Sequence, residues 1–225
     1  LDKEINEIKK LKKNKMIYSI ILTNNSRSLE YIDLLMKRKL FPQKVILIDN
    51  DKNLFLKKLI LKKLKKKVFV KIFRCKTINN KFIKKYLMNI KEKVIVYCGY
   101  PGQIIMDKNL LKNKFFLHSH SGKIPKFKGS TTIFYSILLE RKIFCTSFRL
   151  NEMIDSGKII YKQQYNLPKN FDKIDDYDNK IRAINTFKSL NILAKENFKF
   201  KKNKIKDNFS NYHIMHPVLR YITCK

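Results

Sequence analysis

Met16-Ile17-Tyr18-Ser19-Ile20-Ile21-Leu22-Thr23 is a short apolar run, rich in β-branched residues, that ends at the polar turn Asn24-Asn25-Ser26. Such a run, bounded by turn residues, is typical of a buried strand. Ser26 or Ser28 can then cap a helix with four apolar residues on one face: Leu29, Ile32, Leu35 and Met36. A strand followed directly by a helix is the first half of a βα unit.

The same alternation continues along the chain. Further strands are expected at 44–49, 68–73, 94–98 and 114–117, and helices are expected at 53–66 and 79–89. Continuous apolar strands separated by helices predict an α/β, Rossmann-like, mainly parallel sheet with helices on both faces. Ligands of such sheets lie outside the carboxyl ends of the strands.

After residue 130 the pattern becomes less regular. It predicts a helix at 131–139, strands at 143–150 and 158–164, and a helix at 175–194 that follows Asp-rich caps. A chain of 225 residues can bury one good core. We therefore expect three parts: a basic lead at 1–15, a main domain at 16–165 and a short, mostly helical extension at 166–225.

The net charge of +33 would ordinarily indicate a nucleic-acid or membrane-surface partner. However, 44 of the 51 basic residues are Lys and only 7 are Arg, and Ala occurs only at 183 and 194. Phosphate and groove readers favour the bidentate fork of Arg. The sequence therefore favours a compositional bias over a nucleic-acid surface, although a Lys-rich surface can attract an anionic substrate.

The cysteine spacing and the lengths of the apolar runs indicate the cellular compartment. Cys75, Cys98, Cys145 and Cys224 show no CxxC spacing and are interpreted as buried free thiols in a reducing environment. No apolar run approaches the roughly 18 residues that a membrane span needs. We therefore predict a cytoplasmic protein without a membrane partner.

Two polar segments carry the candidate chemistry. His118-Ser119-His120-Ser121-Gly122 follows the predicted strand at 114–117, and Asn151 to Gly157 lies between two later strands. Each segment is turn-forming and stands beside an apolar run, an arrangement that allows His120 and Asp155 to lie close together but does not establish it. An imidazole beside a carboxylate is suited to general acid–base catalysis.

These segments resemble the core of the folate-dependent formyltransferases. The spacing His120-x-x-x-x-Pro125-x-x-x-Gly129 matches one family motif, and Asp155-x-Gly157 matches the other. The resemblance covers roughly Met16 to Tyr165. It implies the transfer of a formyl group from 10-formyltetrahydrofolate to a primary amine.

The resemblance also implies roles for individual residues. His120 and Asp155 would relay the proton of the attacking amine and polarise the formyl carbonyl. The family has Asn two residues before the catalytic His, where this chain has His118, which would donate to the developing oxyanion together with backbone amides. No metal is implied.

Three further groups of residues are matched to ligand-binding positions of that family. Gly102, Gln103 and Ile104 would present backbone to the pterin of the folate, and a second folate-facing loop would hold Asn151, Glu152 and Ile154. Ser26, Arg27 and Ser28 at a helix N-terminus could bind an anion of the substrate or simply cap the helix. The glycinamide ribonucleotide formyltransferases have a Gly-rich loop there, and this chain has none.

The identity of the acceptor depends on the rest of the chain. Methionyl-tRNA formyltransferases add a β-barrel of about a hundred residues, the size of a small domain, whereas only 60 residues follow Tyr165 here. The preferred acceptor is therefore a small molecule, an amino sugar or sugar nucleotide. Glycinamide ribonucleotide and methionyl-tRNA stay as alternatives.

Two alternatives come from other classes. His118-x-His120, His213-x-x-His216 and Asp155 could form the zinc site of a hydrolase, although His213 and His216 are better explained as packing residues. The Lys runs could instead serve a basic nucleic-acid-binding protein, but aromatic residues do not interleave them. The segment 212–223 is apolar enough to bury against the body or against a second copy in a homodimer.

Overall fold

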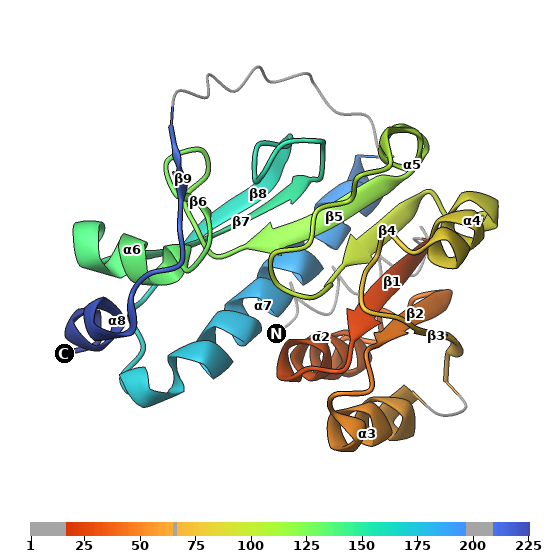
Figure 1. Cartoon of the computed structure of the whole chain (residues 1–225), viewed down its shortest axis with the longest axis horizontal. Helices are drawn as coiled ribbons and strands as arrows, with labels where there is room; N and C mark the ends of the chain where they lie inside the picture. Colours follow the sequence, from red (N-terminus) through yellow and green to blue (C-terminus); the bar gives the residue numbers. More distant parts are fainter. Residues whose placement is uncertain (1–16, 65–66, 197–208) are drawn as a thin grey trace.

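The centre of the molecule is a seven-stranded sheet of order β3-β2-β1-β4-β5-β7-β8 (Figure 1). The structure is a computed structural model that describes residues 17–64, 67–196 and 209–225, so the predicted lead at 1–15 lies outside the described residues. The strands of the sheet are β1 (Tyr18–Thr23), β2 (Lys44–Asp49), β3 (Phe69–Arg74), β4 (Val94–Tyr97), β5 (Phe115–His120), β7 (Ile143–Arg149) and β8 (Ile159–Tyr165). Strands β1 to β5 pair in parallel, and β7 and β8 are antiparallel additions beyond β5.

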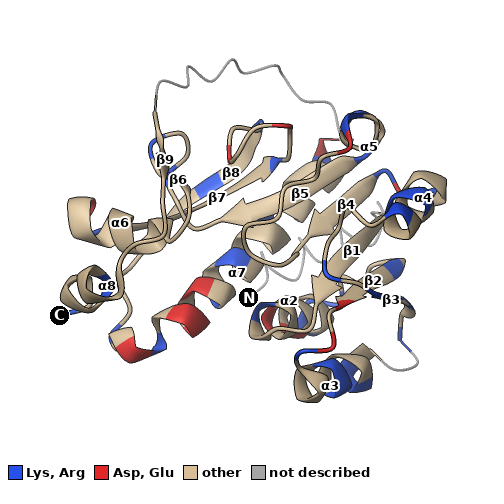
Figure 2. Ribbon diagram, viewed as in Figure 1, with Lys and Arg blue, Asp and Glu red and all other residues tan. Residues whose placement is uncertain are grey.

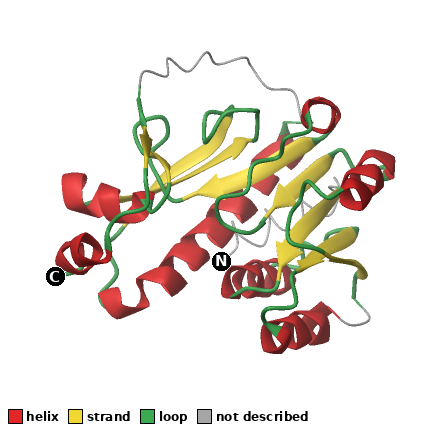
Figure 3. Ribbon diagram, viewed as in Figure 1, coloured by secondary structure: helices red, strands yellow, loops and turns green. Residues whose placement is uncertain are grey.

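Helices cover both faces of the sheet (Figure 3). Buried residues of α2 (Ser26–Lys37), α3 (Leu54–Leu64) and α7 (Ile174–Lys195) pack on one face, and those of α4 (Lys81–Asn89) and α5 (Lys108–Asn113) pack on the other. The remaining described elements are β6 (Lys128–Gly129), α6 (Thr132–Glu140), the 3₁₀ turn η1 (Phe171–Lys173), β9 (Asn211–Tyr212) and α8 (Pro217–Thr223). The predicted mainly parallel α/β fold is confirmed.

The apolar run of β1 is continuous because both of its faces are buried. Side chains alternate across a strand, so Ile20 and Leu22 join the core beneath α2 and α7, whereas Ile21 joins the core beneath α4 and α5. The three side chains are at most 1% exposed. Full burial of such a side chain is worth roughly 1.5–3 kcal/mol, so the sheet centre is a main source of stability.

Several boundaries differ from the sequence-based expectation. The N-cap of α2 is Asn25, whose side chain accepts from the Ser28 backbone nitrogen at 3.0 Å, and neither Ser26 nor Ser28 takes that position. The helix α5 at 108–113 was not predicted, because its short apolar repeat gives a weak signal. The strand β3 is at the sheet edge and largely exposed, and its Lys71 and Arg74 suit an edge that must resist pairing with another chain.

The region expected as an extension contributes directly to the main core. Helix α7 packs against α2, β5, β7 and β8, and its Leu190 and Leu193 are fully buried. Farther along, β9 pairs in parallel with β6. In α8 and just before it, Met215 and Thr223 are buried, whereas Ile214 and Tyr221 are exposed.

Charge is unevenly spread over the described elements. Figure 2 shows Lys and Arg on elements throughout the fold, whereas acidic residues gather at the start of α7. Of the four cysteines, Cys98 and Cys145 are buried as expected, and Cys75 and Cys224 are only half-buried. Among the described helices, none is both long and apolar enough to cross a membrane.

Candidate active site

The two histidines of the first motif lie at the end of β5 and not in the loop that the sequence predicted. The strand runs on past Leu117 because β7 pairs with it antiparallel, His118 opposite Phe148 and His120 opposite Thr146. Alternation then places His118 and His120 on one face of the sheet. The intervening residue and the one that follows, Ser119 and Ser121, face α7 and contact it.

His120 and Asp155 lie together, as expected. The His120 Nδ1 is 3.4 Å from the Asp155 Oδ2, and the two side chains are only 5% and 14% exposed. Asp155 lies in the turn between β7 and β8 with φ of 45°, and its Oδ2 accepts from the Gly129 backbone nitrogen at 2.8 Å. The two sequence motifs are therefore linked twice, through the imidazole and through the amide of Gly129.

The surroundings of His120 assign a proton to its Nε2. That nitrogen lies 3.1 Å from the Phe127 carbonyl oxygen and 3.0 Å from the Thr132 hydroxyl. The Thr132 hydroxyl donates its own hydrogen to the Ser121 carbonyl, so both neighbours of Nε2 act as acceptors. The Nε2–H is thus occupied, and Nδ1 is the atom that faces Asp155 and can gain a proton.

The protonation states suit proton transfer. Burial lowers the pKa of His120 and outweighs the opposing effect of the Asp155 charge, so the resting ring is neutral. Burial opposes ionisation of Asp155, but the neighbouring His120 and His118 and the Gly129 amide hold its pKa below the ordinary value. A neutral imidazole beside a carboxylate can accept a proton at Nδ1 and be stabilised once charged.

His118 does not have the geometry expected of an oxyanion donor. Its Nδ1 is 3.0 Å from the Tyr97 carbonyl oxygen, which can only accept, so Nδ1 carries the hydrogen. Burial lowers the pKa of His118 to about 4, so the ring is neutral near pH 7. In that tautomer Nε2 offers a lone pair and no hydrogen, which corrects the role expected from the family position.

The buried neutral His118 makes stability depend on pH. An unfolded His takes up its proton near pH 6.5, whereas the folded His118 resists protonation until about pH 4. The free energy of unfolding should therefore fall as pH is lowered from about 6.5 to about 4. In urea titrations across this range, His118→Asn should show a shallower decline than the unmodified chain, with His213→Asn, at an exposed position, as the control. Equal slopes for His118→Asn and the unmodified chain would contradict the assignment.

The two loops expected to face the folate are joined by an ion pair. Lys108 at the start of α5 contacts the Glu152 carboxylate at 2.8 Å, which ties the end of the loop at 98–107 to the β7–β8 turn. Both loops expose apolar side chains, with exposed fractions between 41% and 77%: Ile104, Met106, Met153 and Ile154. Such surfaces suit a flat aromatic ligand.

The loop at 102–106 is fixed by residues of the neighbouring β3–α4 connection. The Gln103 side chain donates to the Lys76 carbonyl and accepts from the Ile78 nitrogen, so its amide serves the loop itself. Asn79 donates to the Ile104 carbonyl at 2.8 Å and accepts from the Met106 nitrogen at 3.0 Å. The sequence did not single out Asn79, because Asn before a helix is an ordinary cap.

A cavity of about 560 Å³ adjoins the same loop. It is lined by six residues: Asn79, Lys84, Met106, Asp107, Lys108 and Asn109. It therefore mixes an apolar side chain and two amides with the Asp107 carboxylate and two ammonium groups. In this structure Lys84 pairs with Asp107 and Lys108 pairs with Glu152.

The predicted anion site at the start of α2 is covered by α7. Ser28 is fully buried and its hydroxyl accepts from the Thr23 nitrogen, so it is not available to a substrate. The Ser26 hydroxyl accepts from the Asn179 amide, and the Arg27 Nε donates to the same side chain at 3.1 Å. Ser26 and Arg27 thus bind α7 in this structure.

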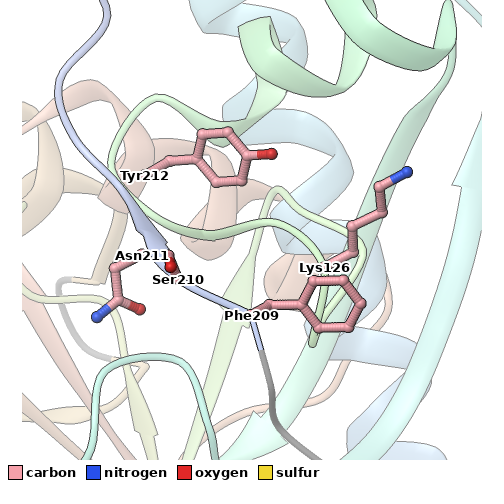
Figure 4. A pocket seen from close by; sticks show the side chains of 5 residues that line it. All are labelled: Lys126, Phe209, Ser210, Asn211 and Tyr212. Carbon is pink, nitrogen blue, oxygen red and sulfur yellow. The ribbon is translucent and has the colours of Figure 1, made fainter.

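A second cavity, of about 260 Å³, lies beside the loop at 123–129. Its lining combines Lys126 with the chain at the start of β9: Phe209, Ser210, Asn211 and Tyr212 (Figure 4). The Ser130 nitrogen donates to the Tyr212 carbonyl, and the Tyr212 ring lies 5.5 Å from that of Phe127. Because Phe127 accepts from His120, β9 supports the loop that holds the imidazole.

The remaining histidines do not join His120. His213 and His216 are exposed, which corrects the expectation that they pack, and the His216 Nδ1 caps α8 by accepting from the Val218 nitrogen. Within 17–64, 67–196 and 209–225, no three His, Cys, Asp or Glu side chains gather as a metal site would require. The zinc hydrolase alternative therefore gains no support from the described geometry.

Comparison with known proteins identifies the fold. No family model and no curated protein sequence matches this chain. Solved structures match over 80–93% of the chain, and the fold that they share with it is that of the formyltransferases. The identities are 18% or lower among those compared, so the likeness establishes the fold.

Three of these structures illustrate the match. A sugar N-formyltransferase from a Shewanella species has a TM-score of 0.60 at 15% identity, covering 93% of this chain and 87% of that chain. A phosphoribosylglycinamide formyltransferase from Anaplasma phagocytophilum has a TM-score of 0.60 at 15% identity, covering 80% and 88%. A methionyl-tRNA formyltransferase from Clostridium thermocellum has a TM-score of 0.56 at 16% identity, covering 90% and 74%.

Proposed function

We propose that this protein is a formyltransferase that moves the formyl group of 10-formyltetrahydrofolate to the primary amine of an amino sugar or sugar nucleotide. The observation that carries the proposal is the buried pair of His120 and Asp155, with Nδ1 of the imidazole 3.4 Å from the carboxylate and Nε2–H held by acceptors. The formyltransferase fold surrounds this pair.

The chemistry requires a proton acceptor. The amine nitrogen forms a bond to the formyl carbon, the bond from that carbon to N10 of the folate breaks, the amine loses a proton, and N10 gains one. His120 Nδ1 takes the amine proton, and the Asp155 carboxylate stabilises the resulting imidazolium. The protonated ring then returns the proton toward N10, which leaves tetrahydrofolate and a formamide.

The folate would lie across the two joined loops. The exposed Ile104 and Met153 side chains offer apolar surface to a pterin. Lys84 and Lys108 beside the 560 Å³ cavity pair with Asp107 and Glu152 in this structure, and they would bind the glutamate tail of a folate by exchanging these partners for its carboxylates. When bound, the folate supplies the formyl carbon.

The turn after β1 bears on the acceptor. The turn after β1 holds Asn24 and Asn25 in place of glycines, which disfavours glycinamide ribonucleotide.

The test is an incubation with 10-formyltetrahydrofolate and three acceptor classes: amino-sugar nucleotides, glycinamide ribonucleotide and methionyl-tRNA. We expect mass spectrometry to detect a formyl adduct with an amino-sugar nucleotide and with neither of the other classes. His120→Ala serves as the inactive control. A folded protein that binds no folate and formylates none of the acceptors would refute the proposal.

A further inference from the structure

A buried ion pair lies on the opposite face of β5 from His120. Arg182 and Asp178, one turn apart on α7, are joined by the Arg182 Nε, which donates to the two carboxylate oxygens at 3.0 and 2.9 Å. Both side chains are only 12% exposed. The mechanism above uses neither residue. Removing one partner of a buried ion pair strongly destabilises a protein, because the other charge is left unpaired.

The pair holds the backbone on both sides of His120. The Arg182 Nη1 donates to the Ser119 carbonyl at 3.0 Å, and the Ser121 hydroxyl donates to the Asp178 carboxylate. Ser119 is held further, because its hydroxyl lies 2.7 Å from that of Thr186 on α7. The residues before and after the imidazole are therefore fixed to one helix.

The pair is itself supported from α2. Arg27 approaches the Asp178 carboxylate at 4.0 Å, and its Nε donates to Asn179. Asp178 therefore lies between two guanidinium groups and the Ser121 hydroxyl, which hold its pKa low despite burial. Its carboxylate stays charged beside the end of β5.

We propose that Asp178 and Arg182 are positioning residues that determine where His120 lies and when it is protonated. The proposal rests on the proposed function, since only that reaction makes His120 the proton acceptor. The titratable groups that act on His120 are Asp155 from the β7–β8 turn, His118 from β5, and Asp178 and Arg182 from α7. The α7 pair acts from behind the strand, whereas Asp155 acts from the front.

The two members of the pair have opposite electrostatic effects on the imidazole. The Arg182 charge lowers the pKa of His120, and the Asp178 charge raises it. Removing each charge in turn should therefore move the titration of His120 in opposite directions. A purely structural role would not produce shifts of opposite sign.

The test is an NMR titration of the His120 imidazole in the full chain, with the signal assigned by its loss in His120→Gln. Arg182→Gln should raise the measured pKa by about one pH unit, and Asp178→Asn should lower it by a similar amount. Asp178→Asn keeps the shape of the side chain, so it remains informative if Arg182→Gln does not fold. Shifts of the same sign, or no shift, would overturn the proposal.

A second measurement separates position from charge. Arg182→Lys keeps the cation but cannot bridge Asp178 and the Ser119 carbonyl together, since Lys lacks the planar fork. It should leave the titration near that of the unmodified chain and still lower kcat about 10- to 100-fold with little change in KM. Arg220→Gln, which removes an Arg that contacts Met215, is the matched control. An unchanged kcat in Arg182→Lys would refute the positioning role.

These experiments distinguish failure of the proposed formyltransferase function from failure of the proposed role of Asp178 and Arg182. Opposite shifts in a chain that formylates no acceptor would refute the formyltransferase function and support the control of His120 by α7. Formylation by the unmodified chain, with no shift in either variant, would refute the role of α7 alone.

Discussion

Asp155→Asn is expected to lower kcat/KM for formyl transfer by about 10²- to 10⁴-fold, the range attributed to general acid–base groups. The amide can still occupy the space beside the imidazole and accept from the Gly129 nitrogen, so the turn should keep its shape. What is lost is the negative charge 3.4 Å from His120 Nδ1, which stabilises the ring after it takes the proton. The effect should therefore appear in kcat.

The control is Asp33→Asn. Asp33 is also a carboxylate with a charged partner, Lys63 at 2.6 Å, but it is exposed on α2 and belongs to neither candidate loop. We expect its rate to stay close to that of the unmodified chain. Steady-state kinetics over a range of pH would measure both variants. An Asp155→Asn enzyme within threefold of the unmodified rate would refute the proton relay.

Gly157→Ala is expected to cause the largest loss of stability, about 3 kcal/mol, at the upper end for overpacking a filled site. An added Cβ would fall well inside van der Waals contact with the Arg149 carbonyl oxygen and 3.0 Å from the Phe148 ring. The backbone cannot yield easily there, because the Arg149 nitrogen donates to the Lys158 carbonyl at 2.9 Å. Strain should then spread to Asp155, two residues away.

Chemical denaturation would measure the loss, and Gly102→Ala is the control. Gly102 has φ of 74°, but an added methyl group would meet nothing within 4 Å, so Ala should cost only about 1–2 kcal/mol there, from backbone strain. The two variants separate steric overlap from conformational strain. Equal losses at both positions would contradict the close approach of the β7–β8 turn to β7.

The sheet could be predicted because its strands have a strong and simple signal. β1, β2 and β4 are buried on both faces, so their apolar runs are continuous and cannot be confused with a half-exposed strand. β5 is different, since its last three residues are His118, Ser119 and His120. Their strand conformation depends on pairing with β7, which a local pattern cannot show.

The sequence could predict the two principal residues of the candidate site but not the residues that hold them in place. His120 and Asp155 stand out because each is polar within a turn-like segment beside an apolar run. Asp178 and Arg182 look like an ordinary solvated pair at helical spacing, and only the packing of α7 against β5 shows that they are buried. The tautomer of His118 could not be predicted from the sequence either, because the carbonyl that fixes it belongs to β4.

The segments that support His120 follow it in the sequence, and they include β9, which pairs with β6. During synthesis His120 and Asp155 leave the ribosome well before Asp178, Arg182 and Tyr212, which hold β5 and the loop at 123–129. A nascent chain ending near residue 165 would contain both reacting groups but neither support. Competence for proton transfer would therefore arise only after α7 and β9 have also emerged.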